Sequence, residues 1–288
     1  MMRPTPRGAW PPMLRDPAGE RDALRTADDA GGLHARSAGR SGGKTMVIDR
    51  GIGWHAYCDM IDAAGAYIDV VKLAFGTSVL YPTELLLRKI GYARRHGITV
   101  MPGGTLLETA VRHDAAAAFF DAVCGLGFDG IEVSEGTIEL GRGERTALIR
   151  EGRARGLTVF AEFGKKEAGS LIDPYELLDA AEADWDAGAS LVTIEARESG
   201  TVGVFDGNGR PDRALFEQIV RLIPDTDRLM WEAPRKEQQV FLIRAAGPNV
   251  HLGNIAPGDV LTLEAMRRGL RNDTFAMQRE PSALEYMI

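Results

Sequence analysis

Cysteine is scarce in this sequence, with only Cys58 and Cys124 among 288 residues. Both lie in helical patterns far apart in the chain, so the sequence predicts buried thiols rather than a disulfide framework, and a reducing, cytoplasmic setting.

The chain has fewer positive than negative side chains, with 34 Lys and Arg against 41 Asp and Glu. Without a basic patch, nucleic acid is not expected as a partner. No apolar run approaches the roughly 20 residues of a membrane helix, so no membrane partner is expected either.

Residues 1–43 are poor in large aliphatic side chains and rich in Arg, Gly, Ala, Pro and Ser. Such a composition buries too little apolar surface to fold, so we expect a disordered extension. The segment also has no apolar stretch of the roughly 7–15 residues found in signal peptides. We expect one folded domain over residues 44–278, followed by a short C-terminal tail over 279–288.

Short apolar runs alternate with helical patterns through the rest of the chain. The runs cover residues 45–49, 68–75, 99–101, 130–134, 158–166, 190–195, 228–232 and 250–254. Strands that alternate with helices predict a parallel sheet of βαβ units. Eight units in about 245 residues predict a single α/β domain, a (β/α)8 TIM barrel, whose typical length is roughly 250 residues. The third helix is expected over 106–126.

Carboxylates stand at the ends of five runs: Asp49, Glu132, Glu162, Glu195 and Glu232. Successive side chains of a strand point to opposite faces, and a carboxylate that faces the apolar helix layer is costly. We therefore expect all five to point into the mouth of the barrel, where the active sites of this fold lie.

Cations are expected at the same level, because five unpaired carboxylates would repel one another and raise one another's pKa values. Lys72 lies inside an apolar strand and needs a partner, so it too should face the mouth. Arg50 follows Asp49 directly, and Lys166 shares the parity of Glu162. A lysine near carboxylates in a semi-dry site can act as a general acid, which makes Lys166 our candidate for that role.

A divalent metal would also relieve the crowding of carboxylates. Oxygen ligands without a His or Cys cluster favour Mg²⁺ over zinc, and Glu132, Glu162 and Glu195 are the predicted ligands. Such a mouth suits a small, multiply anionic substrate. The loop that contains Arg197, Ser199 and Gly200 can present backbone N–H groups to a phosphate, and so can residues 102–105.

Taken together, the strand-end motifs resemble those of the phosphosulfolactate synthase family. They include Thr-Met-Val-Ile-Asp-Arg-Gly at 45–51, Glu-Phe-Gly-Lys-Lys at 162–166, Glu-Ala-Arg-Glu-Ser-Gly at 195–200, Glu-Ala-Pro at 232–234 and Leu-Arg-Asn-Asp-Thr-Phe at 270–275. The resemblance runs in order over residues 44–275. It implies a (β/α)8 barrel, a homo-oligomer, and the Mg²⁺-dependent addition of sulfite to phosphoenolpyruvate to give (2R)-O-phospho-3-sulfolactate.

The resemblance also implies roles for individual residues. Lys166 would be the general acid, with Lys72 as a second catalytic group. The substrate-binding residues would be Asp49, Arg50, Arg197, Ser199, Gly200, Glu232 and Asn254. Two alternatives stay open: a related barrel enzyme that adds another nucleophile to an enol phosphate, and a non-catalytic protein like the plant heat-stress members of the family.

Overall fold

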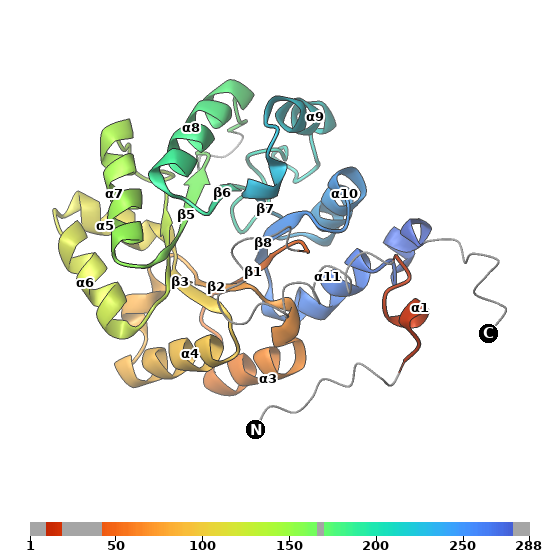
Figure 1. Ribbon diagram of the computed structural model, residues 1–288, viewed down its shortest axis with the longest axis horizontal. Helices are drawn as coiled ribbons and strands as arrows, with labels where there is room; N and C mark the ends of the chain where they lie inside the picture. The colour runs from red at the N-terminus through yellow and green to blue at the C-terminus, as the bar shows by residue number, and fades with distance from the viewer. Residues whose placement is uncertain (1–9, 19–41, 166–169, 279–288) are drawn as a thin grey trace.

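An eight-stranded parallel sheet forms the centre of the molecule in the computed structural model, which describes residues 10–18, 42–165 and 170–278 (Figure 1). The strand order is β3-β2-β1-β8-β7-β6-β5-β4, so the first and last strands of the chain are neighbours. The strands are β1 (Thr45–Asp49), β2 (Val70–Leu73), β3 (Thr99–Pro102), β4 (Gly130–Val133), β5 (Thr158–Phe163), β6 (Leu191–Ile194), β7 (Leu229–Glu232) and β8 (His251–Ile255). The predicted (β/α)8 barrel is confirmed.

Helices follow the strands and cover the outside of the ring (Figure 1). The α-helices of the barrel are α3 (Trp54–Ala64), α4 (Thr83–Arg95), α5 (Gly104–Arg112), α6 (Ala116–Leu126), α7 (Arg142–Ala154), α8 (Pro174–Ala187), α9 (Arg213–Leu222), α10 (Lys236–Ala246) and α11 (Val260–Arg267). Short 3-10 turns are η2 (Gly65–Tyr67), η3 (Thr77–Leu80), η4 (Thr226–Arg228), η5 (Pro257–Asp259) and η6 (Asn272–Met277). Among the described residues, none of these helices combines the length and apolar character needed to cross a bilayer.

The ends of α8 show how local sequence sets an element. The Asp173 carboxylate accepts hydrogen bonds from the N–H groups of Tyr175 and Glu176, and Pro174 occupies the first helical position. Gly188 ends the helix in the left-handed region, with φ of 110°. Residues at both ends thus set the bounds of this helix.

The side chain of Asp129 joins β3 to β4, the two strands at the ends of the sheet order. The Val100 N–H donates to Asp129 Oδ1 at 2.7 Å, and the Asp129 N–H donates to the Val100 carbonyl at 3.4 Å. The two strands are adjacent. A carboxylate therefore supplies part of the bonding that a regular ladder supplies elsewhere in the ring.

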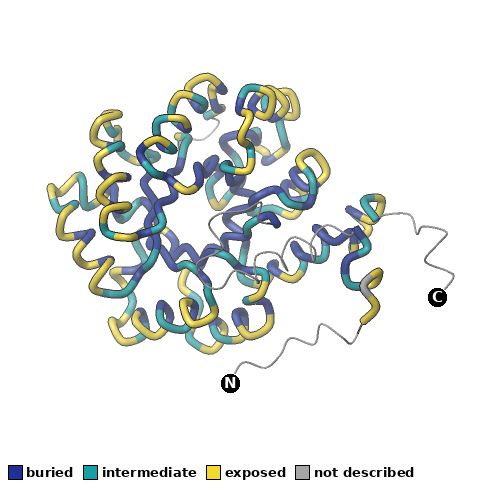
Figure 2. Tube along the Cα trace, in the orientation of Figure 1, coloured by how far each residue is buried: buried dark blue, intermediate teal, exposed yellow. Residues whose placement is uncertain are grey.

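Apolar side chains fill both faces of the sheet. The cluster inside the ring takes one residue from each of six strands: Met46, Val70, Met101, Phe160, Leu191 and Met230. A larger cluster lies between the sheet and the helices, and Figure 2 shows the buried ring inside a half-exposed helix layer. The inner cluster forms an apolar floor beneath the C-terminal ends of the strands, where the polar residues gather.

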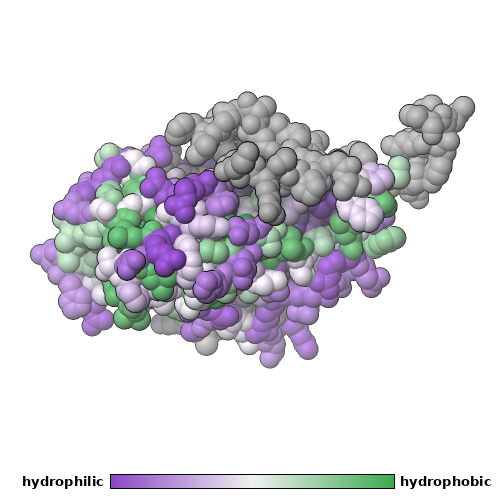
Figure 3. Space-filling view, turned by 90° about the horizontal axis from the view of Figure 1, so that it is seen from below, coloured by the Kyte–Doolittle hydropathy of each residue, from purple (hydrophilic) through white to green (hydrophobic). Residues whose placement is uncertain are grey.

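One feature differs from expectation. The single helix expected over 106–126 is wrong, because the chain turns between α5 and α6, where Asp114 adopts a left-handed φ of 54°. A short helix, α1 (Pro12–Arg15), lies within the N-terminal segment, and Arg268 Nη1 donates to the Arg15 carbonyl at 3.0 Å. Figure 3 shows hydrophilic and hydrophobic residues mixed over the coloured part of one face, as is usual for a solvent-facing helix layer.

Acid is expected to destabilise the barrel through His251, at the start of β8. Its Nδ1 accepts from the Lys44 N–H at 2.7 Å, so Nε2 carries the proton and donates to the Asp227 carbonyl at 2.9 Å. Burial, with a smaller contribution from Lys44, lowers the pKa of His251 to about 4. In the unfolded chain the His251 imidazole takes up a proton near pH 6.5, whereas in the folded chain it does so only near pH 4. The free energy of unfolding is therefore unaffected by this group above pH 6.5, and it falls by about 3 kcal/mol in all between pH 6.5 and 4.

Urea unfolding of the wild type at pH 7 and at pH 4.5 measures this loss. His251→Gln should be less stable at pH 7 and should have a flatter pH dependence. His55→Gln removes an exposed imidazole from α3 and serves as the control. An equally steep acid loss in His251→Gln would assign the effect to other groups.

Candidate active site

Lys72 on β2 stands at the centre of a buried cluster of carboxylates. Its Nζ lies 2.9 Å from Glu232 Oε1, 3.0 Å from Glu132 Oε1 and 3.5 Å from Glu162 Oε2. The four side chains are 6% exposed or less. They come from strands β2, β4, β5 and β7, so the cluster spans the mouth of the ring, and the inward orientation predicted for these residues is confirmed.

The second oxygens of the cluster connect it to the surrounding loops. Glu132 Oε2 accepts from the N–H of Gly104, the first residue of α5, at 2.8 Å. Glu232 Oε2 accepts from the Ala196 N–H at 3.0 Å. Glu132 and Glu232 thus each bind the Lys72 ammonium through one oxygen and a backbone N–H through the other, and these two contacts define the position of each side chain.

Glu195 belongs to the same region, just beyond the end of β6. Its N–H donates to the Phe163 carbonyl at 3.0 Å, and its Oε1 accepts from the Arg197 N–H at 2.6 Å. The negative charge of Glu195 also contributes to the field at Lys72. Arg197 adopts a left-handed φ of 63°, so this carboxylate supports a strained turn at the start of the β6–α9 loop.

The electrostatics of the cluster set the charge of its members. Burial alone would lower the pKa of Lys72, but the surrounding carboxylates, Glu132 foremost, raise it well above its ordinary value. Lys72 therefore stays protonated at neutral pH. Burial and then repulsion from Glu162 raise the pKa of Glu132 to about 7, against the opposing effects of Lys72 and the Gly104 N–H.

Asp49 does not join this cluster, so the prediction that five carboxylates converge in the mouth is wrong for it. Its Oδ2 pairs at 2.6 Å with the ammonium of Lys89 on α4, and both side chains are fully buried. Its Oδ1 accepts from the N–H groups of Gly51 and Ile52, at 2.8 and 2.9 Å. The cost that was expected to exclude a carboxylate from the helix layer is offset by a lysine buried there.

Lys89 is the main residue that sequence reasoning missed. Its Nζ also donates to the Ile52 carbonyl at 2.6 Å and to the Tyr81 hydroxyl at 2.9 Å. The sequence holds a signal for it, because Lys89 falls on the apolar face of α4 between Leu86 and Ala93. A lysine at such a position needs a buried acid.

The other predicted site residues lie at the same end of the barrel with different exposures. Arg50 is exposed, while Arg197 and Ser199 are half-buried. The Ser199 hydroxyl is 2.7 Å from the Thr201 hydroxyl, and Gly200 is buried with φ of 64°. Asn254 is buried at the end of β8 with a left-handed φ of 55°, and its Oδ1 has no hydrogen-bond partner among the described residues. Lys166 lies outside the described residues.

The predicted magnesium ligands are engaged in other contacts. Residues 10–18, 42–165 and 170–278 contain no group of three His, Cys, Asp or Glu side chains arranged to hold a metal. Both oxygens of Glu132 have partners, Lys72 and the Gly104 N–H. Glu162 on β5 and Glu195 just beyond β6 carry carboxylate oxygens, the donor type that magnesium prefers, and this ion commonly uses only one or two carboxylates together with substrate phosphate.

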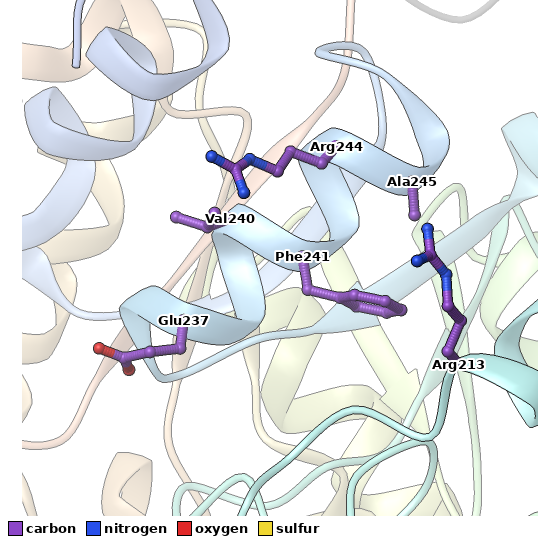
Figure 4. Close-up of a pocket in the computed structure, with 6 residues that line it drawn as sticks. All are labelled: Arg213, Glu237, Val240, Phe241, Arg244 and Ala245. Carbon is purple, nitrogen blue, oxygen red and sulfur yellow. The ribbon is translucent and has the colours of Figure 1, made fainter. Parts of the chain in front are cut away.

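A cleft on the outside of the barrel is separate from this site. Figure 4 shows it between α9 and α10, and it has a volume of about 380 Å³. Its lining residues are Arg213, Glu237, Val240, Phe241, Arg244 and Ala245. It contains none of the predicted site residues.

The chain is similar in sequence to a known protein family over most of its length. The family described as (2R)-phospho-3-sulfolactate synthase (ComA) matches residues 34–273. The chain belongs to this phosphosulfolactate synthase family. It is 39% identical over 238 residues to the phosphosulfolactate synthase of Methanothermobacter thermautotrophicus, covering 82% of this chain and 92% of that protein. For the phosphosulfolactate synthase of Bacillus subtilis the values are 38%, 82% and 93%.

The protein is therefore an enzyme of the phosphosulfolactate synthase family. A more distant relative is the Arabidopsis thaliana protein HEAT-STRESS-ASSOCIATED 32, 28% identical over 236 residues, with 73% of this chain and 79% of that protein covered. Among solved structures, 3-hexulose-6-phosphate synthase from Salmonella typhimurium superposes with a TM-score of 0.51 at 13% identity, covering 82% of this chain and 98% of that one. That likeness shows the fold alone.

Proposed function

We propose that this enzyme adds sulfite to phosphoenolpyruvate to form (2R)-O-phospho-3-sulfolactate. The observation that carries the proposal is the similarity to phosphosulfolactate synthases of two archaea and a bacterium, at 37–39% identity over nearly the whole barrel. The buried Lys72 cluster supports it, because the cluster lies at the C-terminal ends of the strands, where the active sites of this fold are found.

The reaction divides into bond formation and protonation. The sulfur lone pair of sulfite attacks the methylene carbon of phosphoenolpyruvate, and the π electrons move to the carbon that bears the phosphate. The adjacent carboxylate shares this carbanionic charge, which positive groups stabilise. A general acid then delivers one proton to that carbon, creating its stereocentre and completing the product without a leaving group.

The roles of the two lysines differ in this scheme. Because its pKa is raised, Lys72 keeps its proton and serves as a fixed charge toward the substrate carboxylate. Lys166 is proposed as the general acid, on its position in the family motif at 162–166. Arg50, Arg197, and the Ser199 and Gly200 backbone are proposed to receive the phosphate, and Asn254 to orient the substrate.

Mg²⁺ is proposed as the cofactor. Glu162 and Glu195 would hold it, together with oxygens of the substrate. When bound, the ion would supply positive charge next to the phosphate and carboxylate of phosphoenolpyruvate. Homo-oligomeric assembly also stays a prediction, which light scattering of the purified protein checks.

Phosphorus NMR of purified protein with phosphoenolpyruvate, sulfite and Mg²⁺ tests the proposal. A new phosphate-ester signal should appear that requires sulfite, and EDTA should reduce its rate at least about 100-fold if the metal stabilises the developing charge. Lys166→Met should lose activity by a similar factor while remaining folded.

An unchanged phosphoenolpyruvate signal from folded protein would sink the sulfite reaction. A signal that forms equally fast in EDTA would remove Mg²⁺ from the scheme but leave the reaction standing. The alternative nucleophiles are tested by supplying each in place of sulfite in the same assay, because each adduct would give its own phosphate-ester resonance.

A further inference from the structure

The loop between β6 and α9 carries Arg197, Ser199 and Gly200, and its backbone is held from one side by α10. Gln238, in the first turn of α10, is fully buried. Its Nε2 donates to the Gly200 carbonyl at 2.8 Å and to the Gly209 carbonyl at 3.1 Å. One amide group therefore joins two parts of the loop that are nine residues apart in the chain.

Arg235 binds the same two parts of the loop, at the residues that precede Gly200 and Gly209. Its Nε donates to the Ser199 carbonyl at 2.7 Å and its Nη1 to the Asn208 carbonyl at 2.6 Å. Gln238 Oε1 in turn accepts from the Arg235 N–H at 3.1 Å. These bonds commit the guanidinium of Arg235 to loop carbonyls.

The loop fits these two side chains closely at its glycines. A Cβ on Gly200 would lie 2.5 Å from the Gln238 amide, and one on Gly209 would lie 2.2 Å from Arg235 Nη1. Both glycines have a positive φ, 64° and 83°. The sequence therefore places glycine at both points where the backbone must approach α10.

The same β7–α10 segment also contacts the Lys72 cluster. Glu232, three residues before Arg235, binds the Lys72 ammonium at 2.9 Å and the Ala196 N–H at 3.0 Å. Glu232 thus fixes the start of the β6–α9 loop, and Gln238 with Arg235 fixes its middle. Residues 232–238 together determine where Arg197 stands relative to Lys72.

We propose that Gln238 is a positioning residue that sets the β6–α9 loop for the phosphate of the substrate. The inference rests on the proposed function, because it assumes that Arg197 and the Ser199–Gly200 backbone receive that phosphate. Gln238 acts through the loop carbonyls and does not touch the substrate. Its loss should therefore weaken phosphoenolpyruvate binding and leave sulfite binding and the proton transfer largely intact.

The test is Gln238→Leu, which keeps the size of the side chain and removes its hydrogen bonds. We expect KM for phosphoenolpyruvate to rise about tenfold, the effect of one or two lost hydrogen bonds. KM for sulfite and kcat should change less than about threefold. Calorimetric titration with phosphoenolpyruvate alone, and with inorganic phosphate alone, should show the same weakening without turnover.

Gln239 provides the matched control. It is the next residue of α10, equally buried, and its Nε2 donates to the Ala233 carbonyl at 2.9 Å instead of to the loop. Gln239→Leu should cost similar stability without the selective rise in KM. If Gln238→Leu does not fold, Arg235→Lys serves as the second test. Arg235 is half-buried, and lysine at this position keeps the charge but cannot make both loop contacts. KM for phosphoenolpyruvate should therefore rise in this variant too.

The outcomes separate this proposal from the function on which it rests. A KM for phosphoenolpyruvate within twofold of the wild type in folded Gln238→Leu, or an equal rise in Gln239→Leu, would overturn the positioning role and leave the function standing. Wild-type protein that binds phosphoenolpyruvate but never consumes it with sulfite would overturn the function, while the titrations still judge Gln238. Wild-type protein that binds neither phosphoenolpyruvate nor phosphate would overturn both.

Discussion

Replacing Lys72 by methionine is expected to reduce kcat/KM for phosphoenolpyruvate by about 10²–10³-fold. The wild-type cluster sets one ammonium against four carboxylates, Glu132, Glu162, Glu195 and Glu232. Without Lys72 an anionic substrate would approach carboxylates alone. The charge that stabilises the carbanionic intermediate would also be missing, so kcat should fall as well as the affinity.

The same substitution should destabilise the fold. Removing one partner of a buried ion pair typically costs about 3–5 kcal/mol, because the remaining charges stay buried without compensation. Urea unfolding at pH 7 measures this loss. The matched control is Lys236→Met on α10, whose ion pair with Asp273 is solvent-exposed and should contribute less than about 1 kcal/mol.

Lys72→Met that unfolds like the control would mean that the carboxylates take up protons at little cost. Full activity in Lys72→Met would remove the fixed charge from the mechanism and leave stabilisation to the other cations and the metal. Either result is visible only if the kinetics are measured below the unfolding transition, which the urea curve defines.

The sequence allowed the barrel to be predicted because its pattern is repeated eight times. Each unit has a short apolar strand, a turn and an amphipathic helix, so an error in one boundary leaves the count intact. The strands observed at Thr45–Asp49 and Leu229–Glu232 differ from the predicted runs by at most one residue. The helix break at Asp114 was missed, because residues 112–114 contain no glycine or proline to mark a stop, and a short polar run is equally typical of the exposed side of a continuous helix.

The inward carboxylates could be predicted for a physical reason, and Asp49 shows the limit of that reason. Parallel strands in a barrel are apolar on both faces, so Met46, Val47 and Ile48 do not reveal which side faces inward. The decision for Asp49 depended on the assumed absence of a partner in the helix layer. Lys89 supplies that partner from 40 residues further along the chain, and only the fold brings the two together.

The loop contacts were beyond sequence reasoning for a related cause. Gln238 and Arg235 bind backbone carbonyls, and a carbonyl carries no sequence signal. The glycines at 200 and 209 were the visible trace of these contacts, but a glycine-bearing loop is equally typical of phosphate binding. The side chains that hold the loop became recognisable only with their partners in place.

The Asp49–Lys89 pair should contribute as much to the free energy of unfolding as the Lys72 cluster. Lys89→Met leaves a fully buried carboxylate without its cation, and Asp49→Asn leaves a fully buried ammonium without its anion. We expect each single variant to lose about 3–5 kcal/mol in the free energy of unfolding. The double variant should lose clearly less than the sum of the two, because no unpaired charge remains.

A double-mutant cycle measured by urea unfolding at pH 7 gives the coupling energy directly. The control cycle uses Lys236 and Asp273, a pair of similar length on the surface, where the coupling should stay below about 1 kcal/mol. Strictly additive effects at Asp49 and Lys89 would show that the two groups are stabilised by their neighbours, the Tyr81 hydroxyl and the Gly51 and Ile52 N–H groups, and not by each other. Strong coupling would instead mean that the first strand can end in a carboxylate only because α4 carries its lysine.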